Sequence, residues 1–295
     1  MVLFFLMNVP AAQDTENTIT RNQFNFGHQL GYMYSRIDDA WFDETAGWSF
    51  ETGFLTLYTG EMPRVRNPKW KERTMLYIPL YFEFYMGKRI TVQVELTDLF
   101  IEFPYKNIRN TGGKSPRFKT KIGLLNEGRI NPAIAFTVGV KFSSAKPYVI
   151  WEQNHNYDES NGLAGTGTGV ADYLLLFTFS KAFSEALSLH AHLGLAPLGS
   201  PVEYQRGSAQ ADEIPYGVSI RYRKDAVWSG RFELCGMYNG LPATKLAHYS
   251  VVRAKLLWKP RHYTFSLTVG HGLTEESDEW GGGLTYQLSF GKRED

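Results

Sequence analysis

Leu284-Thr-Tyr-Gln-Leu-Ser-Phe290 alternates apolar and polar residues without a break, and only residues 291–295 follow it. In a β-strand successive side chains point to opposite faces, so the apolar residues lie on one face and Thr285, Gln287 and Ser289 lie on the other. A last strand of this kind, ending on an aromatic residue, is typical of the strand that closes a bacterial outer-membrane β-barrel. The stretch therefore predicts a transmembrane barrel, provided that the rest of the chain repeats the pattern.

The same period of two recurs throughout the chain. Segments 263–269, 252–258, 232–238 and 216–222 each carry an apolar residue at every second position. Similar segments lie at 187–195, 173–179, 134–140, 118–124, 90–96, 76–84 and 48–58. Transmembrane strands need about nine to eleven residues of such alternation, and no segment shows a sustained helical period. The chain is predicted to be all-β.

Connection lengths extend this prediction to a topology. Short links at 86–89, 126–131, 181–186, 224–228 and 259–262 alternate with long ones. The long links are expected at 60–73, 100–116, 143–170, 197–215, 239–248 and 271–280. Outer-membrane barrels have short periplasmic turns and longer outer loops, so residues 47–290 are predicted to form an antiparallel barrel of about twelve strands. Pro79 interrupts one strand, where we expect a bulge. A fourteen-strand barrel is the alternative, because segment 24–34 also alternates.

The two ends of the chain are assigned separately. Residues 1–12 resemble the apolar core and small-residue cleavage site of a signal peptide, without the basic residues that normally precede them. We expect a truncated signal peptide there. Residues 13–46 are expected to form an N-terminal extension or one or more extra strands. Residues 291–295 are expected to be a periplasmic tail.

Composition agrees with an outer-membrane protein of a Gram-negative bacterium. Aromatic residues make up 15% of the chain, as expected if rings form girdles at the two membrane interfaces. The net charge of +1 gives no reason to expect a nucleic-acid partner. The single cysteine, Cys235, excludes an intrachain disulfide. The expected partners are outer-membrane lipid, the barrel-assembly machinery and a small-molecule solute.

Charged residues occupy the face opposite the apolar stripe. Arginine or lysine at the lipid face would cost about 2–4 kcal/mol near the membrane midplane, so these side chains are predicted to line the lumen. They are Arg221, Arg223, Arg231, Glu233, Arg253 and Lys255 on three consecutive strands, and Lys119, Lys121, Lys141 and Glu95 elsewhere. Two interpretations remain open: an internal network of ion pairs that fills a narrow barrel, or a polar conduit whose basic walls favour anionic solutes.

Two patterns are weak candidates for metal and phosphate chemistry. His190 and His192 share one strand face and could hold a metal, but spacing supplies no third ligand, so no metal site is predicted. Gly165-Thr-Gly-Thr-Gly169 precedes a strand where a dinucleotide-binding loop requires a helix. No cofactor is expected.

The stretch from Asn154 to Gly162 resembles the Asn-His-Asp-Ser-Asn-Gly motif of the outer-membrane phospholipase A family. In that family the histidine and serine stand two residues apart on one strand face, where the imidazole can take the serine proton. Here the corresponding His155 and Ser160 are five residues apart, in a predicted loop. They are weak catalytic candidates, and the chain is not expected to be an enzyme.

A second resemblance covers about a third of the chain. Lys119–Val140, "KTKIGLLNEGRINPAIAFTVGV", and the segments "GVADYLLLFTFSKAF" and "LHAHLGLAPLGSP" within 167–201 are similar to outer-membrane barrels named for the MetA pathway of phenol degradation. The resemblance implies an outer-membrane channel or transporter that passes small, often hydrophobic compounds, and it implies no catalytic residues. A phospholipase-like hydrolase and a closed structural or adhesive barrel are the alternatives.

Overall fold

The computed structural model describes residues 37–42, 46–59, 73–105, 108–113, 116–142, 171–197, 212–241, 248–260, 262–274, 277 and 279–291. Its strands are β1 (Ala46–Thr59), β2 (Arg73–Tyr85), β3 (Ile90–Tyr105), β4 (Ile108–Gly113), β5 (Arg117–Leu125), β6 (Ala133–Lys141), β7 (Asp172–Ala182), β8 (Leu187–Leu195), β9 (Asp212–Arg223), β10 (Trp228–Leu241), β11 (His248–Trp258), β12 (Tyr263–Gly272) and β13 (Trp280–Gly291). Within the described residues, no helix is long and apolar enough to cross a lipid bilayer.

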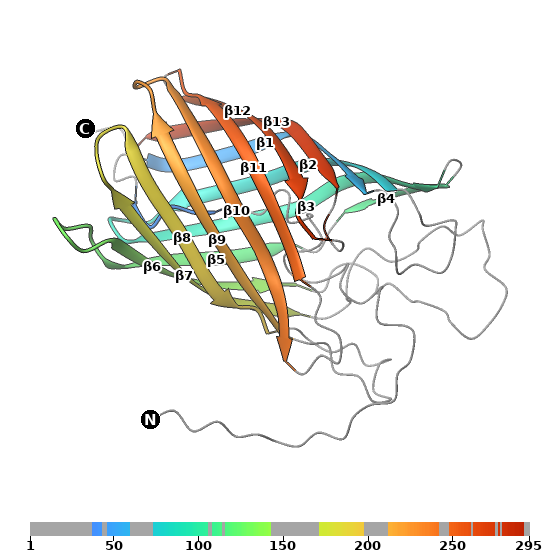
Figure 1. The fold of residues 1–295 in the computed structure, drawn as a ribbon, viewed down its shortest axis with the longest axis horizontal. Helices are drawn as coiled ribbons and strands as arrows, with labels where there is room; N and C mark the ends of the chain where they lie inside the picture. The colour runs from blue at the N-terminus through green and yellow to red at the C-terminus, as the bar shows by residue number, and fades with distance from the viewer. Residues whose placement is uncertain are drawn as a thin grey trace.

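The strands form one closed antiparallel barrel. β1 pairs with both β2 and β13, which closes the ring, and the other strands pair with their neighbours in the chain, except that β4 and β5 both pair with β3 and not with each other. β4 and β5 are two stretches of one strand, because both pair with β3 in the same register. Leu99 of β3 pairs with Gly113 of β4, and Glu95, four residues earlier on β3, pairs with Arg117 of β5, four residues later in the chain. The barrel therefore has twelve strands. In Figure 1 the orange strands β10 and β11 cross the near side of the barrel, and the blue and cyan strands β1 and β2 lie behind.

The ends of the barrel differ in their connections. The turn end carries the short links, such as Gly87 with its φ of 75° and the Asp225 turn, whose carboxylate accepts hydrogen bonds from Val227 and Trp228. The loop end carries the remaining connections. The prediction of a long loop at 100–116 was wrong, because β3 and β4 pair as a hairpin across residues 106–107. The connection between β10 and β11 was also predicted to be long, but it spans only residues 242–247. It is no longer than the turn 126–132 between β5 and β6.

Two local features follow from single residues. The expected bulge at Pro79 is confirmed by a register shift between Ile78 and Leu80 where β2 pairs with β3. At the seam that closes the barrel, Gly53 and Gly283 face backbone so closely that a Cβ at either position would overlap a carbonyl oxygen of the neighbouring strand. Segment 24–34, which suggested a fourteen-strand barrel, lies outside the described residues.

The outer face is apolar and ringed by aromatic side chains. Leu267 is 47% exposed, whereas its neighbour Thr268, which points inward, is 3% exposed. At the turn end the ring of Trp48 stacks on Phe290, and Trp228 stacks on Trp258. Such an apolar belt, with an aromatic girdle where it meets water, matches the surface of a barrel that spans a lipid bilayer.

This alternation can be tested with two adjacent positions on β12. Leu267→Arg would place a cation in the apolar belt, so we expect it to reduce the stability of the inserted barrel by about 2–4 kcal/mol. Ser266→Arg should be better tolerated, because Ser266 lines an internal cavity. Heat-modifiability gels of both refolded variants measure the folded fraction. Equal loss in the two variants would show that this face does not contact lipid.

Candidate lumen site

The inward charges of β9, β10 and β11 gather around one carboxylate. Glu233 is fully buried and lies 2.6 Å from Arg253 Nε, 3.4 Å from Lys255 Nζ and 3.6 Å from Arg231 Nη1. Arg253 is also buried, while Arg223 is exposed near the turn end. The Coulombic attraction among these groups offsets the cost of taking them out of water only because the partners are so close. This part of the lumen is therefore filled by one carboxylate and the three basic side chains around it.

A second group of charges lies where β3 faces β5. The Glu95 carboxylate accepts a hydrogen bond from Arg117 at 2.6 Å, and Lys119 donates a second one. Lys141, opposite Arg117 on β6, is fully buried. Lys121 instead donates to the backbone carbonyls of Asp39 and Trp41, at 3.0 and 3.2 Å. The predicted lumen lysine Lys121 thus binds a segment that belongs to no strand.

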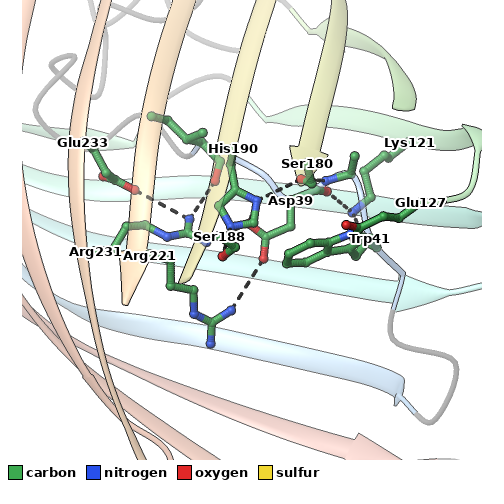
Figure 2. A network of polar contacts seen from close by, with 12 residues as sticks. Asp39, Trp41, Lys121, Glu127, Ser180, Ser188, His190, Arg221, Arg231 and Glu233 are labelled. Atoms are coloured by element: carbon green, nitrogen blue, oxygen red, sulfur yellow. Dashed lines mark hydrogen bonds and ion pairs between the residues drawn. The ribbon is translucent and has the colours of Figure 1, made fainter. Parts of the chain in front are cut away.

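That segment, residues 37–42, lies against the inner wall ahead of β1. Asp39 Oδ1 is 2.6 Å from Arg231 Nη2 and 3.1 Å from His190 Nδ1, and Asp39 Oδ2 is 3.8 Å from Arg221. Figure 2 shows the Asp39 side chain among these three residues, which come from β8, β9 and β10. Arg231 also donates to the Ile37 carbonyl at 2.9 Å. We call residues 37–42, with these contacts, the lumen segment.

Electrostatics keep Asp39 ionised. Burial alone would raise the pKa of the Asp39 carboxyl, but the nearby positive charges, Arg231 above all, hold that pKa well below the ordinary value. A carboxyl shifted in this direction stabilises its contacts above its unfolded pKa of about 4 and loses that contribution only as the pH falls further. The ion pairs of the lumen segment should therefore persist at neutral pH.

The other end of the lumen segment rests on β6 and on the β5–β6 turn. Trp41 Nε1 donates to Glu127 at 2.9 Å, and Glu127 also accepts from the Ala182 amide and pairs with Lys181 at 3.0 Å. Ala40 packs on the small side chains of β6, Ala133 and Ala135. Its amide donates to Ser180 Oγ at 2.7 Å. Small residues on β6 thus make the space in which the segment lies.

The two predicted histidines are part of the same wall. His190 Nδ1 lies 2.8 Å from Ser180 Oγ, and its Nε2 lies 3.0 Å from Ser188 Oγ. His192 packs beside Ile37 over Gly217, where a Cβ would come within 2.8 Å of His192 Nε2. Among the described residues, no group of three or more histidine, cysteine, aspartate or glutamate side chains could hold a metal ion. The catalytic candidates His155 and Ser160 lie outside the described residues.

A cavity of about 380 Å³ lies between the lumen segment and the turn-end half of the wall. Its lining includes five basic residues and four acidic ones, with threonine, serine and glutamine side chains from β12 and β13. Four members of this lining were predicted from the sequence to lie in the lumen: Lys121, Arg221, Arg231 and Lys255. Asp39 and Trp41 were missed, because they lie in a short segment without the alternation that marks a strand.

Comparisons with known proteins show the fold. No family model and no curated protein matches the chain. Solved structures do, among them an outer membrane channel from Pseudomonas putida F1, with 13% identity, a TM-score of 0.62, and coverage of 87% of this chain and 100% of the other. The match to the NanC porin has 8% identity and a TM-score of 0.48, and it covers 83% of this chain and 99% of the porin. The match to the CymD monoaromatic hydrocarbon channel has 10% identity and a TM-score of 0.46, and it covers 83% of this chain and 89% of the channel. The chain has the fold of an outer-membrane β-barrel.

Proposed function

We propose that this protein is an outer-membrane channel for small compounds, whose path is narrowed by the lumen segment. The observation that carries the proposal is the polar cavity of about 380 Å³ beside that segment, because it leaves room in the lumen for a small solute. The channel fold shared with the P. putida protein supports the proposal. So does the sequence resemblance to barrels named for the MetA pathway.

The proposed surroundings follow from the two faces of the barrel. Outer-membrane lipid covers the apolar belt, and the barrel-assembly machinery inserts the chain, as it does other outer-membrane barrels. The solute enters the lumen, where paired charges and hydroxyl groups replace part of its hydration. The basic residues predicted to line a conduit act here mainly through their ion pairs, so a simple preference for anions is not part of the proposal.

Liposome swelling tests the channel. Vesicles that contain the purified protein, placed in iso-osmotic solutions of uncharged solutes of increasing size, should swell with the smallest solutes and not with the largest. Vesicles without protein are the control. A closed structural barrel is the second candidate, favoured by the buried Arg253–Glu233 pair. It predicts no swelling with any solute, and that result would reject the channel.

A further inference from the structure

Six of the seven charged residues that line the cavity from the barrel wall are grouped by sign around the ring, and the seventh, Lys121 on β5, donates to the lumen segment. Arg221, Arg231 and Lys255 come from β9, β10 and β11, and Lys259 follows β11 in the next turn. Glu51 and Glu83 come from β1 and β2. We call these two groups the basic wall and the acidic wall. In the ring, only β12 and β13 lie between β11 and β1.

The strands between the two walls carry neutral hydrogen-bonding groups. Ser266 and Thr285 form a hydroxyl pair at 3.2 Å, and Gln287 donates to Ser49 at 3.1 Å. The lumen segment bounds the cavity elsewhere with Trp41 and Phe42 and with the acids Asp38 and Asp39, and Asp39 pairs with Arg231 of the basic wall. A solute in the cavity would thus meet positive charge toward one side, negative charge toward the other, and hydroxyl and amide groups along the way.

Ion pairs and hydrogen bonds hold both walls in place. Arg231 pairs with Asp39 and Lys255 with Glu233, while Glu83 accepts hydrogen bonds from Tyr85 at 2.9 Å and Gln93 at 3.0 Å. Fixed charges act strongly across a lumen that is partly shielded from bulk water. Such a field attracts a molecule with two opposite charges at both ends, but it attracts a singly charged molecule at one end and repels it at the other.

We propose that this cavity binds dipolar ions, with the solute carboxylate toward the basic wall and its ammonium group toward Glu51 and Glu83. The inference deepens the proposed function, because it names the class of solute that the channel would hold. Binding can nevertheless be measured on detergent-solubilised protein without transport. Failure of the binding and failure of the channel are therefore separate results.

Isothermal titration calorimetry with 4-aminobutanoate, butanoate and butylamine tests the proposal, with titrations into protein-free micelles subtracted. We expect 4-aminobutanoate to bind more tightly than either singly charged compound. Glu51→Gln and Lys259→Gln should each weaken its binding by about two- to fivefold, the range of a partly exposed ion pair. Glu51→Gln should leave butanoate binding unchanged or stronger, whereas Lys259→Gln should weaken it.

Matched controls carry the same changes outside the cavity. Glu185→Gln and Lys224→Gln alter exposed residues in turns at the same end of the barrel, and they should leave all three affinities unchanged. Heat-modifiability gels show that each variant is folded. Butanoate binding as tight as that of 4-aminobutanoate, or no binding of either, would overturn the proposal. Binding of 4-aminobutanoate without liposome swelling would keep the site and remove the channel.

Discussion

Glu233→Ala should destabilise the folded barrel by about 3–5 kcal/mol, the cost of removing one partner from a buried charge network. Glu233 lies within 3.6 Å of charged groups of Arg231, Arg253 and Lys255, and its side chain is fully buried. Without it, Arg253, Lys255 and Arg231 lose the carboxylate that they share, although Arg231 keeps its ion pair with Asp39. The midpoint of urea unfolding in lipid vesicles, followed by heat-modifiability gels, measures the loss.

A second variant separates the charge effect from simple loss of packing. Replacing both Glu233 and Arg253 by methionine removes one buried charge of each sign, so the double variant should be more stable than Glu233→Ala. Glu185→Ala, in an exposed turn, should leave the midpoint unchanged. A wild-type midpoint for Glu233→Ala would mean that these ion pairs do not hold the lumen together.

Asp39→Ala should release the lumen segment and widen the path. The change removes the ion pair to Arg231 and the contact with His190, and a charged hydrogen bond contributes about 1.5–3 kcal/mol. That range lowers the ratio of bound to released segment by about ten- to a hundredfold. In liposome swelling, Asp39→Ala should admit solutes that the wild-type protein excludes, with Glu185→Ala as the charge-matched control.

Steric release offers an independent route to the same result. Ala135 is fully buried under Ala40, so Ala135→Leu would fill the space that the segment occupies without changing any charge. It should enlarge the size limit in the same direction as Asp39→Ala. An unchanged size limit in both variants would show that the lumen segment does not narrow the path.

The barrel could be predicted from the sequence because its strands obey one local rule. Lipid outside and a polar lumen inside force the alternation that makes Leu267 exposed and Thr268 buried. The hairpin of β3 and β4 does not follow this rule, so the sequence did not predict it. Gly112 and Gly113 are poor strand residues, and the hairpin is defined by backbone pairing such as Phe100 with Gly112.

The lumen site could be predicted only in part. Alternation placed Arg231 and Glu233 on the inner face, but it could not say which acid each arginine meets, since that depends on the register between strands. The contact between Asp39 and Arg231 joins residues 192 positions apart. The lumen segment has no periodicity of its own, because its position is set by single hydrogen bonds and by the small residues beneath it.

Single-channel current across planar bilayers tests most directly the claim that this barrel is a channel narrowed by residues 37–42. We predict discrete current steps for the wild-type protein and larger steps for Asp39→Ala under the same salt and voltage. The Glu185→Ala control should give wild-type steps. The absence of current steps in both the wild-type protein and Asp39→Ala, with heat-modifiability gels showing both folded, would contradict the account.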